Sequence, residues 1–398
     1  MSAPASAVPA APRRRLVAAP DGLLAAFFLA FLGTAGIFYV NIMPAIVSGL
    51  IDGLHFGARE AGWVGAANVY GAACGALLAV WIAPRLNWRR LAAVLLCLLI
   101  LIDLLSTGLR TPLPLIAMRA LHGLVGGTLV GTSFMVISRT RIPERTFGVL
   151  IFVQYGLGGL GLALLPRLVI RVGPQVLFLV IGGFSAITLL MLPFLSAYPP
   201  RPRTAQAPSA AGPRAPRLLA LALVAVFLFQ AGNMALLAYI IELGRAYGLA
   251  TDRISLIIGS ANCFGMLGTL LVVWLGVRHG RLLPLGIVLA SAIGGVALLH
   301  LSGDTGWFIV ANIVTTIAWA TCIPYLFGMC ATFDSTGRSA TLSSFASKVG
   351  LASGPFAASL IVGDGQWGLL INLAVATLGA SAVTALVPAA ALDRRART

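Results

Sequence analysis

Three charged side chains, Asp103, Arg119 and Lys348, lie deep inside otherwise apolar stretches, and His122 lies one turn beyond Arg119. A charge at the depth of the hydrocarbon costs at least about 2.5–3.5 kcal/mol on insertion scales, so each is a candidate for function. Asp103 and Arg119 each lie eight residues from Thr111. If two helices are joined by a turn at Thr111, Asp103 and Arg119 lie at the same depth in the membrane and can form an ion pair.

This predicted pair has two interpretations. As a proton site, a protonated Asp103 would release Arg119, and His122, one turn further along the same face, would tune or relay the proton. As a structural pair, Asp103 and Arg119 would only allow two charges to persist in an apolar phase. A histidine in such a helix is also common as a packing residue, so both interpretations remain open.

Lys348 has no acidic residue at a matched depth in its own or the neighbouring stretches. It lies about eight residues from the nearer end of its stretch, too deep for its side chain simply to reach the interface. A cation in this position is suited to anchor a carboxylate or another anionic group of a substrate. The residue that corresponds to it in the first half of the chain is Gln154.

Uncharged polar side chains supply the other candidates for substrate binding. Asn68 and Asn262 occupy equivalent positions between glycines, where an amide either contacts substrate or bonds to a neighbouring helix. The remaining candidates for the lining of a cavity are Tyr39, Asn41, Gln230, Asn233, Asn312 and Trp319.

The composition identifies the elements that must position these residues. Of the 398 residues, 59% are hydrophobic and 10% are charged, whereas soluble domains carry about 25% charged residues. These values exclude a soluble enzyme and a disordered chain. The net charge of +16 comes from short basic clusters between apolar runs, which is typical of membrane topology and not of nucleic-acid binding.

Twelve apolar runs are long enough to cross about 30 Å of hydrocarbon as helices. Their predicted limits are 22–50, 60–83, 91–109, 114–138, 147–170, 175–196, 218–243, 254–276, 282–301, 306–331, 340–362 and 366–389. With the N-terminus inside, the inner segments contain 19 arginines and the outer segments six. By the positive-inside rule both termini are cytoplasmic, in a multi-pass protein of the inner membrane.

The predicted domain organisation is two six-helix bundles. A cytoplasmic tail (1–21) precedes the N-terminal bundle (22–196), and a second tail (390–398) follows the C-terminal bundle (218–389). The intervening segment 197–217 is rich in Pro, Ala and Arg, which is typical of a flexible cytoplasmic linker.

An internal repeat relates the two bundles. GAANVYG at 65–71 recurs as GSANCFG at 259–265, and further matches follow in order at nearly the same offset. Because each half has an even number of spans, the halves enter the membrane with the same orientation and form parallel pseudo-repeats.

The chain resembles the major facilitator superfamily over residues 20–390. The motifs are the loop Pro84–Arg90 with its second copy Val277–Arg281, and Arg119–Gly123, which fits the family's Arg-x-x-Gln-Gly with His in place of Gln. Both loop copies lack the family's acidic residue. Gly156–Gly161 resembles the glycine-rich motif of antiporters without its Gly-Pro pair, and Gly350-x-x-x-Gly354-Pro355 is also common in the family.

The resemblance implies an all-α, twelve-helix membrane transporter that works by alternating access between its halves. We expect proton-coupled movement of a small organic molecule, most simply efflux, by a monomer in the lipid bilayer without a cofactor or a metal. The alternatives are proton-linked import of a small organic anion and, in another class, a non-transporting membrane sensor or assembly partner. The sequence carries no P-loop and no hydrolase motif, so an enzyme is not expected.

Overall fold

Apolar runs in lipid must satisfy their own backbone polar groups, and the chain does so by forming helices at each predicted span. The computed structural model describes residues 17–20, 22–141, 143–199, 215–275, 280–333, 338–363 and 365–397. Most of the tail 1–21 and of the linker 197–217 lies outside these residues. Ten helices of the described chain are long and apolar enough to cross a membrane. Two further spans, described below, complete the predicted twelve.

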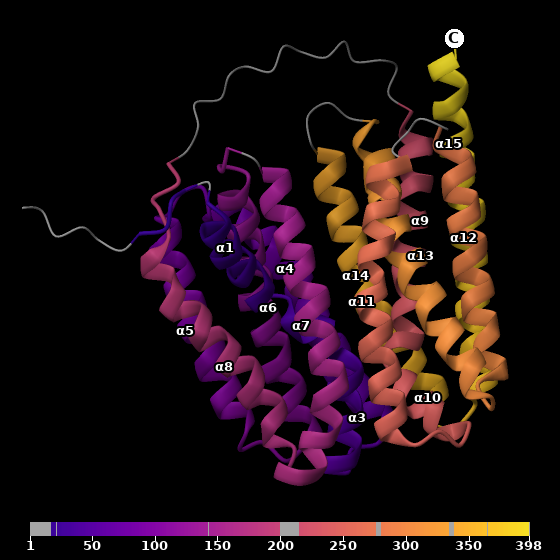
Figure 1. The fold of residues 1–398 in the computed structure, drawn as a ribbon, viewed down its shortest axis with the longest axis horizontal. Coiled ribbons are helices and arrows are strands. Elements are labelled where there is room, and N and C mark those ends of the chain that lie inside the picture. Colours follow the sequence, from indigo (N-terminus) through magenta and orange to yellow (C-terminus); the bar gives the residue numbers. More distant parts are fainter. Residues whose placement is uncertain are drawn as a thin grey trace, which may run out of the picture.

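The helices form two bundles that lie side by side (Figure 1). The N-terminal bundle contains α1 (Leu23–Ala35), α2 (Phe38–Asn41), α3 (Met43–Leu54), α4 (Ala58–Ile82), α5 (Trp88–Ser106), α6 (Pro112–Ile137), α7 (Pro143–Val172), α8 (Gln175–Met191) and η1 (Leu192–Phe194). The C-terminal bundle contains α9 (Pro216–Leu237), α10 (Ile240–Ala246), α11 (Thr251–Leu275), α12 (Leu282–Ala297), η2 (Leu298–Leu301), α13 (Thr305–Ala331), α14 (Arg338–Val362) and α15 (Trp367–Arg397).

Three spans differ from simple apolar helices. The seventh, predicted as one run over 218–243, is divided into α9 and α10. The helix α5 has 19 residues and carries Arg89, Arg90 and Asp103 along an otherwise apolar sequence. The first span, predicted as one run over 22–50, is instead broken into α1, α2 and α3 and ends at Leu54. Pro44 explains the second break, because its nitrogen cannot donate to the carbonyl of residue 40 and its ring disfavours a continuous helix.

The internal repeat is visible in matching contacts between helices. Thr128 Oγ1 donates to Gly75 O (3.1 Å) and Leu124 O (2.8 Å), where α6 packs on α4. At positions 193 residues later, Thr321 Oγ1 donates to Gly268 O (3.2 Å) and to Ile317 O (2.8 Å), where α13 packs on α11. Both bundles therefore use the same packing between their second and fourth spans.

The last span differs from its predicted limits. The sequence predicts a span that ends at 389 and a tail beyond it, whereas α15 continues as helix to Arg397. Asp393 explains the extension in part, because its carboxylate accepts hydrogen bonds from the backbone of Arg281 and Leu282 at the start of α12. The end of α15 is thereby attached to the bundle.

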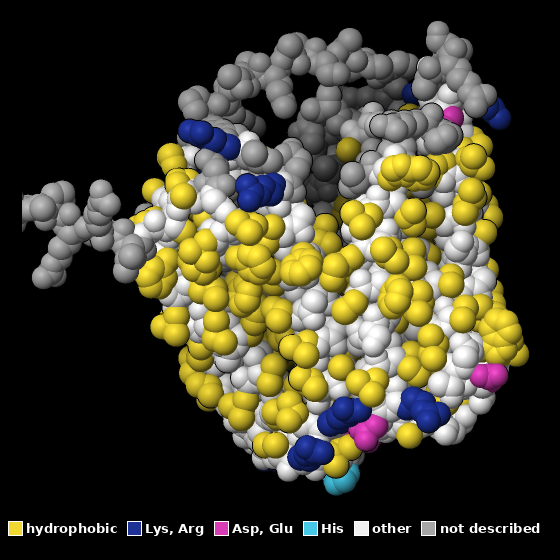
Figure 2. All heavy atoms as spheres, in the orientation of Figure 1, with side chains coloured by type: hydrophobic (Ala, Val, Ile, Leu, Met, Phe, Trp, Pro, Cys, Tyr) yellow, Lys and Arg dark blue, Asp and Glu magenta, His cyan; other side chains and the backbone are white. Residues whose placement is uncertain are grey.

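We call the end of the molecule where α9 begins and α15 ends the terminal face, and the other end the opposite face (Figure 1). Figure 2 shows apolar side chains over the middle of the visible side and basic side chains towards both ends. The same view shows the surface hollowed between the bundles at the terminal face.

Candidate functional site

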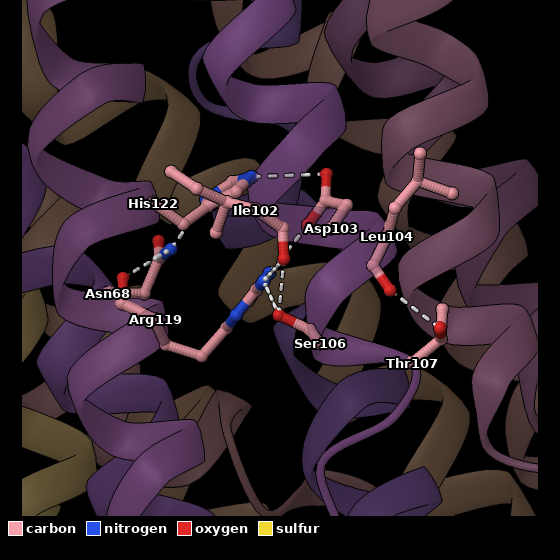
Figure 3. Close-up of polar contacts among 8 residues, drawn as sticks. All are labelled: Asn68, Ile102, Asp103, Leu104, Ser106, Thr107, Arg119 and His122. Atoms are coloured by element: carbon pink, nitrogen blue, oxygen red, sulfur yellow. Dashed lines mark hydrogen bonds and ion pairs between the residues drawn. The ribbon is translucent and has the colours of Figure 1, made fainter.

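A buried ion pair joins α5 and α6 inside the N-terminal bundle (Figure 3). Arg119 Nη1 donates to Asp103 Oδ1 at 2.8 Å, and the two side chains are 0% and 1% exposed. Arg119 Nη2 also donates to Ser106 Oγ and, at 3.4 Å, to Ile102 O, while its guanidinium lies 4.9 Å from the centre of the Phe178 ring. The predicted pair thus forms. The sequence analysis did not anticipate Ser106, which lies one turn from Asp103.

The contacts of Asn68 fix the state of the neighbouring histidine. Asn68 Nδ2 lies 3.2 Å from Arg119 O and 2.9 Å from His122 Nδ1. A carbonyl oxygen only accepts, so the amide nitrogen is the donor and His122 Nδ1 is an acceptor. His122 is therefore a neutral ring with its proton on Nε2, which lies 3.4 Å from Asp103 Oδ2.

Tyr39 extends this cluster towards the broken first span. It lies in α2, is 1% exposed, and its ring centre is 6.0 Å from that of His122. Its hydroxyl has no hydrogen-bond partner within the described chain. An unpaired buried hydroxyl is costly to maintain, so this position is suited to exchange partners. We call Tyr39, Asn68, Asp103, Arg119 and His122 the N-terminal cluster.

A second polar network lies in the C-terminal bundle. Gln230 in α9 accepts a hydrogen bond from Trp319 Nε1 through its Oε1 (2.8 Å) and donates through its Nε2 to Ser347 Oγ (2.7 Å). Gln230 is buried and Trp319 is half-buried. Both the oxygen and the nitrogen of the Gln230 amide are hydrogen-bonded. Gln230 therefore fixes the position of the Trp319 indole in α13 relative to α14.

Lys348 directly follows Ser347 and is half-buried. Within the described chain it forms no ion pair and no hydrogen bond. Gln154, its predicted counterpart in α7, is also half-buried and forms no hydrogen bond with the described residues. Neither side chain is thus committed to a polar partner within the described chain, and the structure does not join them directly.

The other predicted residues fall into two groups. Asn262 Nδ2 donates to Tyr155 O across the halves (2.8 Å). Asn41 lies next to the same side of Gly158 as Asn262, and its amide nitrogen is unpaired within the described chain. Asn233 and Asn312 instead donate to carbonyls four residues earlier in their own helices, at 2.8 Å each. These two are therefore not brought into a shared network.

The sequence analysis missed an ion pair that joins the halves at the opposite face. Arg245 Nη2 in α10 lies 2.6 Å from Asp52 Oδ2 in α3, and Arg245 Nη1 lies 3.2 Å from Glu242 Oε1. The repeat was a signal for this contact, because Asp52 and Arg245 are 193 positions apart, close to the repeat offset, and lie in corresponding parts of the two halves.

Further contacts between the halves extend from the middle of the membrane to the opposite face. Arg167 Nε lies 3.0 Å from Asp252 Oδ1, and the Tyr239 hydroxyl donates to Ala58 O at 2.8 Å. Tyr70 and Ser353, which share a hydrogen bond of 2.8 Å, lie near the middle of α4 and α14. Within the described chain the halves are thus joined at the opposite face and diverge towards the terminal face.

The arrangement defines a class of protein: a multi-pass membrane protein of two pseudo-symmetric helical bundles, with polar groups buried within and between them. The described residues contain no group of three or more His, Cys, Asp or Glu side chains that could hold a metal ion. The sequence model of the Major Facilitator Superfamily matches residues 23–359, and the chain belongs to this family. It is a transporter, not an enzyme.

Comparison with solved structures agrees with this assignment of the fold. The nucleoside transporter NupG has 14% identity and a TM-score of 0.73, with 92% of this chain and 98% of that chain covered. A variant of the peptide transporter POT has 11% identity and a TM-score of 0.72, with 94% and 95% covered. An inward-facing, unoccupied bacterial homologue of the lysosomal transporter Spinster has 13% identity and a TM-score of 0.65, with 92% and 95% covered. No curated protein matches the chain.

Proposed function

We propose that this transporter is coupled to protons and exports a small organic molecule across the inner membrane by alternating access. The main support for proton coupling is the N-terminal cluster. One carboxylate oxygen of the buried Asp103 is paired with Arg119, and the other lies 3.4 Å from His122 Nε2. A carboxylate in this position changes the charge of the whole cluster when it takes up a proton. Tyr39, with its unpaired hydroxyl, provides the link between this cluster and the broken first span.

The distribution of contacts between the halves supports alternating access. The ion pairs Asp52–Arg245 and Arg167–Asp252 join the halves at the opposite face, while the surface is hollowed between them at the terminal face (Figure 2). Rocking of the two bundles would break these contacts and close the terminal face. A transport cycle between two such states requires a binding region near the middle of the membrane, where Asn262 and Gln230 lie.

The proposed orientation places the terminal face in the cytoplasm. Arginines are concentrated in the segments at this face, as the positive-inside rule requires. Single-cysteine labels at position 210 and at the C-terminus should react only with a reagent supplied from the cytoplasmic side. Labels at Gly53 and Gly303 should react from the outside, and the reverse pattern would contradict the orientation.

The direction of transport is tested in vesicles of both orientations. Everted and right-side-out vesicles are given an imposed pH gradient and a labelled panel of nucleosides, dipeptides, carboxylates, amides and amines. Proton-driven export predicts accumulation in everted vesicles that are acidic inside, and loss of accumulation when the gradient is dissipated. Accumulation in right-side-out vesicles that are acidic outside would instead favour the import of organic anions, for which Lys348 is the natural anchor. Absence of transport of every compound in both orientations would contradict proton-driven export of this panel.

A further inference from the structure

The starting point is the distribution of charge inside the membrane. The sequence has one lysine, Lys348, among 26 arginines, and it lies ten residues after the first residue of α14. Asp103 is the one acidic residue deep within a span, and it is already paired with Arg119. The remaining acidic residues lie at or beyond the ends of the predicted spans. Lys348 is therefore a basic side chain in the middle of the membrane without an acidic partner within the described chain.

The position of Lys348 along α14 indicates which face of this helix carries its side chain. Ser347, Gly350 and Gly354 form the face of α14 that packs against α9, with Ser347 bonded to Gln230. Lys348 lies on a different face, which it shares with Ser359 eleven residues later. Ser359 Cβ lies 2.9 Å from the position that a Cβ on Gly62 of α4 would occupy, so this face of α14 meets the N-terminal half. Lys348 is half-buried, and its face of α14 is the one that turns towards the N-terminal half.

An aromatic side chain is connected through Gln230 to the residue that precedes Lys348. Gln230 connects Trp319 Nε1 (2.8 Å) with Ser347 Oγ (2.7 Å), and Lys348 is the next residue after Ser347. The indole is half-buried and its single donor is already bonded, so its remaining surface is apolar. A ligand between the halves would meet a cation and a fixed aromatic plane within the reach of one small molecule.

From these three observations we propose that the substrate is an organic anion, whose negative group pairs with Lys348 and whose apolar part lies against Trp319. This inference rests on the proposed function, because it assigns the substrate class of the same transport pathway. A neutral or cationic substrate would leave Lys348 without a counter-charge in a region of low dielectric.

Because Lys348 is the single lysine, it can be observed directly. Reductive methylation with ¹³C-formaldehyde places a probe on Lys348 and on the terminal amine, and it preserves the positive charge. Titration of the full-length protein in nanodiscs with benzoate should shift the Lys348 signal, whereas the isosteric neutral benzamide should not. Equal shifts with both, or none with benzoate and with longer aromatic carboxylates, would overturn the proposal.

Substitutions test the same pairing through transport. Lys348→Gln should weaken apparent affinity for the transported carboxylate by about 10- to 150-fold, which is the usual range for a hydrogen bond to a charged group. Lys348→Arg should retain part of the affinity. Trp319→Leu should reduce the preference for aromatic over aliphatic carboxylates without affecting the requirement for charge. Thr377→Val, on the exposed side of α15, is the matched control and should change none of these values.

The outcomes separate this inference from the proposed function. Proton-driven transport of a neutral or cationic compound, or unchanged affinity in Lys348→Gln, would overturn the substrate class and leave proton coupling intact. Transport of an anion that depends on Lys348 but not on the pH gradient would support the substrate class and refute proton coupling. Lys348→Gln removes no hydrogen bond or ion pair within the described chain, so the variant should fold, and its melting temperature verifies this.

Discussion

His122 Nε2 lies 3.4 Å from Asp103 Oδ2, deep inside the N-terminal bundle. Arg119 holds the other oxygen of the same carboxylate, so Asp103 lies between a guanidinium and a neutral imidazole. The carboxylate oxygen that faces His122 accepts no hydrogen bond within the described chain. This oxygen is the position at which a proton would be added with the least disturbance to the Arg119 pair.

The first prediction concerns Asp103. Asp103→Asn should abolish transport driven by a pH gradient, because the amide cannot exchange a proton. It also leaves Arg119 buried without a counter-charge, which typically costs about 3–5 kcal/mol of stability. The measurement is accumulation in vesicles, normalised to folded protein in the membrane.

A double variant separates chemistry from stability. Asp103→Asn combined with Arg119→Gln removes both charges and should recover most of the lost melting temperature. If Asp103 is the proton site, driven transport should remain absent in this variant. Full recovery of driven transport would show that the pair is only structural.

The second prediction concerns the tautomer of His122. Because Asn68 donates to Nδ1, we expect ¹⁵N NMR at neutral pH to show a neutral ring with its proton on Nε2. Asn68→Leu removes this donor and should alter the His122 signal, which His122→Gln assigns among the four histidines. A ring protonated on both nitrogens, or on Nδ1 alone, would contradict the network.

The third prediction concerns the contact between the halves. Gly159 in α7 and Gly259 in α11 approach so closely that a Cβ on either would lie 2.7 Å from the carbonyl oxygen of the other. Gly259→Val should therefore disfavour the state that is closed at the opposite face. Overpacking of about 1–3 kcal/mol corresponds to a shift of roughly 5- to 150-fold in the population ratio.

This shift is measured by pulsed electron paramagnetic resonance between spin labels at Arg110 in the N-terminal half and Ala246 in the C-terminal half. Both positions lie at the opposite face. The distance distribution should move to longer values in Gly259→Val. Gly156→Val in the same glycine-rich segment is the matched control, because nothing lies within 4 Å of its added Cβ. An equal effect in both variants would argue against a specific contact.

The fourth prediction concerns the ion pair at the same interface. Arg245→Gln should also favour opening of the opposite face, but by less than about fivefold in population. The pair is partly exposed, at 24% for Arg245 and 32% for Asp52, and such pairs typically contribute about 0.2–1 kcal/mol. The same spin-label distances report the change, and a larger effect than that of Gly259→Val would reverse this ranking.

The sequence predicted the features that follow from hydropathy and charge. Spans are evident because each needs about 20 apolar residues, and the Asp103–Arg119 pair follows from helical rise on either side of Thr111. The contacts of Asn68 and Gln230 could not be predicted, because an amide can bond in any direction and its partners lie on other helices. The break between α1 and α3 was also missed, since apolar character continues across it and only Pro44 indicates a change.

The two copies of the loop cap the helix that follows them in different ways. In the first copy, Asn87 Oδ1 accepts hydrogen bonds from Arg89 N (3.1 Å) and Arg90 N (3.4 Å) at the start of α5. The equivalent residue 193 positions later is Gly280, which has no side chain and a φ of +74°. Asp393 takes its place at the start of α12.

The last prediction follows from this replacement. Asp393 accepts from Arg281 N at 2.9 Å and from Leu282 N at 2.8 Å, and its negative charge is favourable at a helix N-terminus. Asp393→Ala should lower stability by about 0.5–2 kcal/mol, the usual effect of losing an N-terminal cap. Removal of residues 393–398 should have the same effect, because the cap comes from α15 and not from the loop itself. Thermal unfolding of the purified protein measures both, with Thr384→Val in α15 as the control, since its hydroxyl bonds only within its own helix. A truncated protein as stable as the full chain would show that α15 does not support the start of α12.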